Sequence, residues 1–213
     1  MASLADIRKD YSKAKLDIKS VAVQPIAQFE LWFAEALEAK VPEPNAMSLA
    51  TVSKPGRPTS RIVLLKGIES GCFVFYSNYQ SQKGKELDEN PACALNFFWP
   101  ELERQVRIEG IADRVSEEKS TAYFQSRPRA SQISAWASPQ SLLISDRSIL
   151  EERVKQIEKK YEGHSVLPKP KQWGGFQVEP HLIEFWQGRS SRLHDRIVYT
   201  RLDKDWKISR LAP

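Results

Sequence analysis

Three basic side chains stand at alternate positions near the C-terminal end of the sequence. Arg192, His194 and Arg196 follow the aromatic pair Phe185 and Trp186 across a short Gly/Ser turn. Alternate side chains of a β-strand share one face, so these groups would line roughly 13 Å of it at about 3.3 Å per residue. Like charges in such a row repel one another unless water or an anion lies opposite. A solvated strand edge is the ordinary interpretation of an isolated row, but the aromatic neighbours favour a flat anionic ligand.

An apolar run bounded by two cations offers a second candidate. Arg61 and Lys66 enclose the run 62–65, and strict alternation places the two cations on opposite faces of a strand. Cations at strand ends usually reach solvent along their apolar stems. The same pattern also suits a strand that lies between two anionic groups, or near a seam between subunits.

A third candidate lies where a strand ends and a helix begins. Tyr76 and Ser77 precede Lys83 there, and the free backbone N–H groups of a helix start attract anions. Alone this is a weak signal, because many helices begin with serine. Three polar residues stand beside apolar runs: Gln105, Gln140 and Ser141. Their side chains could form hydrogen bonds with the edge of a heteroaromatic ring, or they could form purely structural hydrogen bonds.

A phenol, a guanidinium and a hydroxyl recur at intervals of four. Tyr123, Arg127 and Ser131 would share one face of a continuous helix. Pro128 interrupts that helix but also suits the first position of a new turn. The three groups together suit a phosphate monoester, and an ordinary exposed helix face fits the spacing equally well.

Composition and missing motifs exclude several classes. The net charge is +5, and the basic residues are mixed with acidic ones, so no nucleic-acid-binding block is present. No dinucleotide, P-loop or serine-hydrolase motif occurs, and the histidines at 164, 181 and 194 are too scattered to predict a metal site. There is no apolar run of membrane-spanning length and no signal peptide, so we expect a cytoplasmic protein.

The chemistry-bearing residues must be positioned by short strands with added helices. Hydrophobic periodicity predicts a first helix from Pro25 to the proline-rich stop at 41–45. Further helices are expected at 81–89, at 116–126, from near 128, and at 146–162. Strands are expected at 46–52, 59–68, 72–77, 92–99, 104–115, 181–187, 196–202 and 206–211. We therefore predict a mobile N-terminal segment, 1–24, followed by a single domain, 25–213, that is mainly β with added helices (α+β) and forms a closed antiparallel barrel.

Several long motifs occur in order and in register. They include Arg-Ile-Val-Leu-Leu-Lys, Phe-Tyr-Ser-Asn, Tyr-Phe-x-Ser-Arg-Pro-Arg, Trp-Gly-Gly-Phe, Glu-Phe-Trp-Gln-Gly and Arg-Leu-His-Asp-Arg. From about Ile7 to Pro213 the chain resembles the pyridoxine/pyridoxamine 5′-phosphate oxidases. The resemblance implies an FMN-binding split β-barrel, antiparallel and Greek-key-like, that works as a homodimer with two flavin sites across the subunit interface.

The resemblance also assigns roles residue by residue. It implies contacts to FMN from Arg61, Ile62, Val63, Leu64, Leu65, Lys66, Tyr76, Ser77, Gln82, Lys83, Gln105, Gln140, Ser141, Trp186 and Arg196. It implies contacts to the substrate from Arg8, Tyr11, Lys66, Tyr123, Arg127, Ser131, Arg192, Leu193 and His194. Arg192 and His194 would lie over the pyridine ring and act in catalysis.

The implied reaction oxidises pyridoxine 5′-phosphate or pyridoxamine 5′-phosphate to pyridoxal 5′-phosphate. Hydride passes to FMN, O2 reoxidises the flavin and H2O2 is released, while the protein supplies positioning and charge. Arg196 would stabilise negative charge on reduced flavin. His194 would either accept a proton, which an ordinary pKa near 6.5 allows, or serve only to position the substrate.

Two residues depart from the family pattern, and two rival functions remain. The family often has arginine where this chain has Gln82, and aspartate where it has Glu43. A missing cation at position 82 predicts a modest loss of FMN affinity, which Lys85 is placed to offset. The rivals are another split-barrel flavin reductase and a non-enzymatic carrier of flavin or pyridoxal phosphate.

Overall fold

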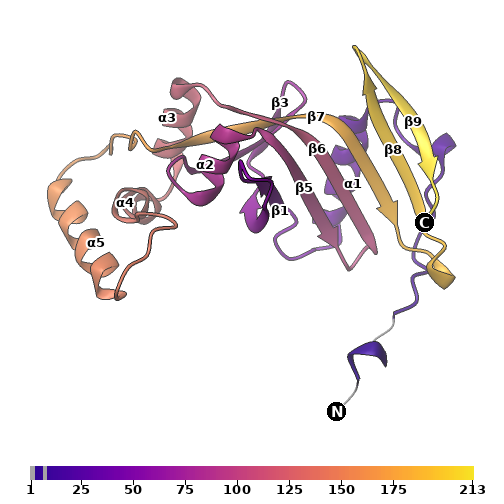
Figure 1. Cartoon of the computed structure of the whole chain (residues 1–213), viewed down its shortest axis with the longest axis horizontal. Coiled ribbons are helices and arrows are strands. Elements are labelled where there is room, and N and C mark those ends of the chain that lie inside the picture. The colour runs from indigo at the N-terminus through magenta and orange to yellow at the C-terminus, as the bar shows by residue number, and fades with distance from the viewer. Residues whose placement is uncertain (1–2, 7–8) are drawn as a thin grey trace.

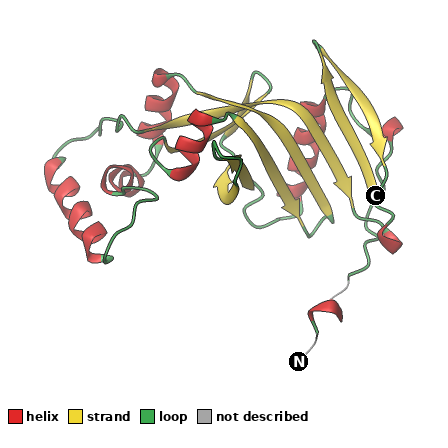
Figure 2. Ribbon diagram, viewed as in Figure 1, coloured by secondary structure: helices red, strands yellow, loops and turns green. Residues whose placement is uncertain are grey.

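A computed structural model describes residues 3–6 and 9–213, and strands dominate it (Figures 1 and 2). The elements in chain order are η1 (Leu4–Asp6), η2 (Ile18–Ser20), α1 (Pro25–Glu38), β1 (Ala46–Val52), β2 (Pro58–Leu64), β3 (Gly67–Glu69), β4 (Cys72–Asn78), α2 (Gln82–Glu89), β5 (Ala92–Trp99), β6 (Arg104–Arg114), α3 (Glu117–Ser126), α4 (Arg129–Ala137), α5 (Ser148–Lys160), β7 (Trp173–Gln187), η3 (Ser190–Arg192), β8 (Asp195–Leu202) and β9 (Asp205–Leu211).

The strands form one antiparallel sheet that curls on itself. Its hydrogen-bonded order is β2-β1-β5-β6-β7-β4-β3, and β8 and β9 continue from β7. The edge strands β2 and β3 are consecutive in the chain, and only Leu65 and Lys66 join them. This short link forces the two edges together, and β2 contacts β4 across the gap. The predicted antiparallel split barrel with added helices is confirmed. The barrel is not closed by hydrogen bonds as predicted, because among the described strands β2 forms a ladder only with β1. The sheet is curled and open at this seam, and the short chain link holds its two edges together.

Helix α1 fills the barrel from one side. It begins at Pro25, as predicted, and its buried face presents Phe29 and Trp32. The Phe29 ring packs edge-on against Phe73 at 5.0 Å, and Trp32 does so against Phe185 at 5.2 Å. Burying these large rings removes apolar surface from water, which fixes the barrel around them.

A second, smaller core lies where α3, α4 and α5 meet the start of β7, at the left of Figure 1. It contains Phe124, Ile133, Tyr161, Leu167 and Trp173. Because Trp173 pairs with Asn78 at the C-terminal end of β4, the three helices lie beside that end of the barrel, where β2 also ends.

Strand β7 is longer than predicted, because Gly174 and Gly175 continue it. Glycine ordinarily weakens strands, and the predicted strand began only at residue 181. Here the backbone passes so close to its neighbours that a Cβ on Gly174 would lie 1.9 Å from the Tyr79 hydroxyl. A Cβ on Gly175 would lie 2.9 Å from Tyr76. Glycine is thus required here for close approach, and the strand begins at Trp173.

Two other expectations about strands are wrong. The predicted strand 59–68 is interrupted at Leu65 and Lys66, where the chain crosses between the sheet edges. Arg192, His194 and Arg196 do not share one strand face, because only Arg196 lies in β8. The backbone of Arg192 has φ +60°, in the left-handed region, and this turn breaks the alternation.

The N-terminal segment lies against the barrel from Tyr11 to Ala22. The Ser12 and Lys13 backbone N–H groups donate to the buried Glu103 carboxylate at 2.9 and 3.0 Å. Farther along, the Tyr199 hydroxyl donates to the Ala22 carbonyl at 2.6 Å. Arg8 lies outside the described residues. None of the helices in the described part of the chain has the length and apolar character needed to cross a membrane.

Replacing Gly84 with alanine should destabilise the start of α2. A Cβ there would lie 2.2 Å from the Tyr79 carbonyl oxygen, so the backbone must shift. We expect the free energy of unfolding to fall by about 1–3 kcal/mol, measured by urea denaturation. Gly67→Ala is the matched control, because nothing lies within 4 Å of its Cβ position. Equal denaturation midpoints for the two variants would contradict this packing.

Replacing Glu103 with alanine should release the N-terminal segment. The change removes two charge-assisted hydrogen bonds, each worth about 1.5–3 kcal/mol. We expect trypsin to cut native protein after Lys13 several times faster than in the unmodified chain. Glu101→Ala provides the control, because only the Glu101 backbone carbonyl contacts Lys13. If cleavage rates do not change, Glu103 is not the anchor.

Candidate functional site

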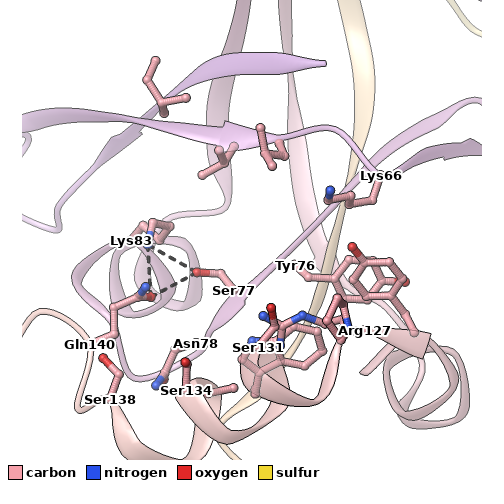
Figure 3. Close-up of a pocket in the computed structure, with 17 residues that line it drawn as sticks. Lys66, Tyr76, Ser77, Asn78, Lys83, Arg127, Ser131, Ser134, Ser138 and Gln140 are labelled. Atoms are coloured by element: carbon pink, nitrogen blue, oxygen red, sulfur yellow. Dashed lines mark hydrogen bonds between the residues drawn. The ribbon is translucent and has the colours of Figure 1, made fainter. Parts of the chain in front are cut away.

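A cavity of about 630 Å³ opens where the barrel meets the helical cluster (Figure 3). One wall is the end of β2 and the Lys66 link, and another is the end of β4 with the start of α2. Helices α3 and α4 close the remaining side. The lining residues are Ile62, Val63, Leu64, Lys66, Tyr76, Ser77, Asn78, Lys83, Tyr123, Arg127, Pro128, Ser131, Ser134, Ala135, Ser138, Gln140 and Trp173. Eleven of these are residues that the sequence analysis assigned to the flavin or the substrate.

Three polar groups converge at one end of the cavity. The Lys83 ammonium lies 3.3 Å from the Ser77 hydroxyl and 3.3 Å from the Gln140 amide oxygen (Figure 3). Lys83 stands in the first turn of α2, which Ser81 caps by accepting the Gly84 N–H. Burial, and then the positive charge of Arg61, lower the pKa of Lys83. A bound anion would favour the charged form of this lysine, so the end is suited to a phosphate.

The opposite end of the cavity also carries positive charge, and it is formed around Arg127. Its guanidinium lies 4.7 Å from the Trp173 ring centroid, in cation–π contact. Burial lowers the pKa of Arg127, and its Nη1 is buried without a hydrogen-bond partner among the described residues. Buried polar groups are nearly always paired, so an unpaired one indicates a missing ligand or water. Lys66 faces the same space (Figure 3).

The predicted grouping of Tyr123, Arg127 and Ser131 occurs, but not on a continuous helix. Helix α3 ends at Ser126, Arg127 is extended, and α4 begins after Pro128. The bend turns the side chains of both helices toward one cavity. Proline disfavours the helical conformation for the residue before it, which explains the break at Arg127.

Three stacked aromatic rings form a floor on the Arg127 side of the cavity. The Tyr76 and Tyr123 rings lie 3.8 Å apart at an interplanar angle of 17°. Trp173 continues the stack 5.5 Å from Tyr76. Sequence reasoning did not assign Trp173 to the site, although the Trp-Gly-Gly motif was the signal that could have found it.

Arg61 and Gln82 lie behind the Lys83 end rather than on the cavity wall. Arg61 donates to the Thr51 hydroxyl at 2.5 Å and to the buried Glu86 carboxylate at 3.2 Å. Gln82 donates to the other Glu86 oxygen at 2.9 Å. Burial alone would raise the pKa of Glu86. The hydroxyls of Thr51 and Thr59 also donate hydrogen bonds to its carboxylate. Together with the bonds from Gln82 and Arg61 they outweigh the effect of burial and lower the pKa to about 2. The ionised Glu86 therefore fixes Arg61, a role that the sequence did not reveal.

Two more predicted flavin contacts lie outside the cavity lining. Leu65 is buried and faces an apolar groove beside α1. Ser141 is exposed and has φ +71°, immediately after Gln140.

A separate group crosses the neighbouring strands β6, β7 and β8. Gln105 pairs in register with Trp186, which pairs with Arg196. Arg196 donates through Nε and Nη2 to both oxygens of the buried Glu184 carboxylate, at 2.7 and 3.1 Å. The hydrogen bond to Glu184 raises the pKa of Arg196. A guanidinium held in this bidentate way has a fixed position.

The third group lines a second cavity of about 530 Å³, formed by Lys9, Asp10, Tyr11, Arg189, Ser191, Arg192 and His194. The Tyr11 ring stands edge-on to Trp186 at 5.7 Å and lies 5.9 Å from His194. Leu193 is mostly exposed beside them. Within one protomer, the described lining of the first cavity includes neither Arg192 nor His194.

The first cavity suits a flat ligand with an anionic tail better than a metal ion. No group of three or more potential metal ligands occurs among residues 3–6 and 9–213. The cavity combines an aromatic floor, an apolar edge at 62–64 and ammonium and hydroxyl donors at the Lys83 end. Its volume is typical of small-molecule sites. These residues fit the flavin ring and the phosphate of FMN.

Comparison with known proteins identifies the family. A family model described as pyridoxamine 5′-phosphate oxidase matches residues 33–161, and one described as the pyridoxine 5′-phosphate oxidase C-terminal dimerisation region matches residues 173–213. The pyridoxine/pyridoxamine 5′-phosphate oxidase of Paraburkholderia phytofirmans is 54% identical, with full coverage of both chains. That of Acaryochloris marina is 53% identical over 99% of this chain and 96% of its own.

Solved structures agree with this comparison. PhzG from Burkholderia lata, crystallised with tetrahydrophenazine-1-carboxylic acid, is 32% identical over 92% of this chain and 95% of its own, with a TM-score of 0.86. A pyridoxamine 5′-phosphate oxidase-related, FMN binding protein from Nostoc punctiforme is 18% identical over 91% of this chain and 100% of its own, with a TM-score of 0.70, and shares the fold. The chain therefore belongs to the pyridoxamine 5′-phosphate oxidase family, an assignment that supports FMN as its cofactor.

Proposed function

We propose that the protein oxidises pyridoxine 5′-phosphate and pyridoxamine 5′-phosphate to pyridoxal 5′-phosphate, with O2 as the electron acceptor and H2O2 as a product. The observation that carries the proposal is a cavity with two separate cation ends, of which one contains an unpaired buried N–H group of Arg127. Two phosphorylated ring molecules bound together require two such ends.

Each end has its own ligand in this proposal. Lys83 and Ser77 hold the phosphate of FMN, and Arg61 adds positive charge from behind them. Lys66, Tyr123, Arg127 and Ser131 hold the substrate phosphate. FMN supplies the hydride acceptor, and the side chains supply binding, orientation and charge.

A second protomer completes the site. Arg192 and His194 line a different cavity within one chain, yet the proposed reaction needs them over the pyridine ring. Both residues, with Trp186 and Arg196, lie in the segment matched by the family's dimerisation region. We infer that the copies of these residues from one protomer reach the flavin and substrate held by the other, so that the homodimer is the active unit.

The direct test is to supply each substrate to the flavin-loaded protein in air. Pyridoxal 5′-phosphate and H2O2 should form in equal amounts from both phosphorylated substrates, and much less efficiently from unphosphorylated pyridoxine. Flavin binding without product would support the carrier function instead. Turnover of a carboxylated phenazine precursor in place of the phosphorylated pyridines would favour an activity on the class of ligand bound to PhzG.

Replacing Arg127 with leucine should weaken substrate binding while FMN remains bound. Hydrogen bonds to charged groups contribute about 1.5–3 kcal/mol, so we expect KM for pyridoxine 5′-phosphate to rise roughly 10- to 100-fold. Steady-state kinetics and flavin absorbance measure the two effects. Arg147→Leu, at an exposed position on the N-terminal side of α5, is the control. Equal loss of FMN and of substrate binding would contradict the assignment.

Replacing Gln82 with arginine should strengthen FMN binding. The side chain already donates to Glu86 beside the Lys83 end, so an arginine there would add a cation near the proposed phosphate position. We expect the Kd for FMN to fall by several-fold up to about tenfold, measured by flavin fluorescence. Glu89→Gln changes the net charge equally at the far end of α2 and controls for it. An unchanged Kd would show that position 82 does not contribute.

A further inference from the structure

A buried ion pair stands behind the Lys83 end of the cavity. The Glu86 carboxylate belongs to α2, the helix that carries Lys83, and its side chain is only 7% exposed. Its Oε2 lies 3.2 Å from Nη2 of Arg61, on β2. The proposed binding of FMN uses Lys83 and Arg61 but gives no part to this carboxylate.

The guanidinium of Arg61 is committed to the groups around Glu86. Nη1 donates to the Leu49 carbonyl at 3.3 Å and to the Thr51 hydroxyl at 2.5 Å. Nη2 donates to the Thr59 hydroxyl at 2.5 Å as well as to Glu86. The two hydroxyls donate their own hydrogens to Glu86, at 2.5 and 2.7 Å. A guanidinium has two hydrogens on each terminal nitrogen, so all four are in use and the cation is held toward the carboxylate.

Both charges of the pair act at Lys83. Burial is the main cause of the lowered pKa of Lys83; the positive charge of Arg61 lowers it further, and the negative charge of Glu86 opposes them with a smaller effect. The pair therefore presents its positive side to the anion position, but with less than the strength of a full cation. Burial opposes the ionisation of Glu86, yet its hydrogen bonds outweigh burial and lower its pKa to about 2, so the opposing charge is present at neutral pH.

Gln82 does not relieve this negative charge. It donates an amide N–H to Oε1 of Glu86 at 2.9 Å, and an amide is neutral. Among the described residues, Arg61 is the one cation in ion-pair contact with Glu86. A phosphate at Lys83 would thus lie near two cations and one fixed carboxylate.

We propose that Glu86 limits the affinity of the protein for FMN, because its fixed negative charge repels the flavin phosphate and offsets the attraction of Arg61. The inference rests on the proposed function, which assigns the Lys83 end to that phosphate. Glu86 then both positions Arg61 and sets how strongly FMN is preferred over riboflavin, which has the same ring system but no phosphate.

Flavin binding to Glu86→Gln tests the proposal without reference to activity. The amide keeps the size of the side chain and a carbonyl acceptor for its neighbours but removes the charge. In a fluorescence titration of the full chain freed of flavin, we expect the Kd for FMN to fall about 3- to 10-fold relative to the unmodified chain, while the Kd for riboflavin does not change. Equal changes in the two constants, as a merely structural role would give, or an FMN constant that stayed the same or rose, would overturn the proposal.

Two matched variants separate the charge from its surroundings. Glu89→Gln makes the same charge change at the exposed C-terminal end of α2, and Glu86→Asp keeps the charge at the buried position. Both should keep the FMN preference of the unmodified chain. A gain in either variant as large as that of Glu86→Gln would overturn the proposal.

Should Glu86→Gln not fold, the double variant Arg61→Gln/Glu86→Gln removes the pair as a unit and leaves no buried charge without its partner. Loss of a full cation from a phosphate contact costs about 10- to 150-fold in affinity. Because Glu86 offsets Arg61, we expect the preference for FMN over riboflavin to fall by less than about tenfold in the double variant. A larger fall would overturn the proposal.

The unmodified chain distinguishes this inference from the proposed function on which it rests. If it bound riboflavin as tightly as FMN, the assignment of the Lys83 end to a phosphate would be refuted, and the inference with it. A clear preference for FMN that Glu86→Gln left unchanged would refute the inference alone.

Discussion

A buried guanidinium with one N–H group unpaired is the feature on which the candidate site depends. Arg127 is held over the Trp173 ring at the break between α3 and α4. Leaving such a donor unpaired costs free energy, so the fold retains a position that an anion would stabilise. The same logic applies at the Lys83 end, where burial and a nearby arginine lower the pKa of the ammonium group. The folded chain thus holds two cationic positions that a bound anion would stabilise, even in the absence of ligand.

The scaffold explains why these two ends face each other. The link at Leu65 and Lys66 joins the two edges of the sheet, so the barrel must curl until β2 lies beside β4. The helical cluster then covers the open end through Trp173, which belongs both to β7 and to the second core. Buried carboxylates act from behind: Glu86 fixes Arg61 and Glu184 fixes Arg196. Arg61 and Arg196 therefore each have a defined position rather than a flexible one.

Much of this was predictable from local patterns. The start of α1 at Pro25 and the antiparallel barrel followed from helix-capping chemistry and short alternating strands, and both are confirmed. The spacing of Tyr123, Arg127 and Ser131 fitted a shared phosphate site and an exposed helix face equally well, and the three side chains line one cavity. Here proline altered the local geometry without separating the side chains.

Other features depend on contacts distant in sequence. Gly174 and Gly175 are strand residues only because Tyr79 and Tyr76 approach their backbone. The alternation of Arg192 and His194 fails because a left-handed turn intervenes. The roles of Glu86, Glu184 and Glu103 come from partners more than ten residues away, which no spacing rule reveals. The predicted residues divide between two cavities, which is the basis for the proposal that two protomers share the site. The sequence suggested that arrangement only through the family resemblance.

A crystal structure of the dimer with FMN and pyridoxal 5′-phosphate is the most direct measurement of the central claim. The account predicts that the phosphate of the pyridine accepts a hydrogen bond from Nη1 of Arg127, that the flavin phosphate lies at Lys83, and that His194 of the other protomer approaches the pyridine ring. A pyridine phosphate bound elsewhere, with the Arg127 guanidinium still unpaired, would contradict it.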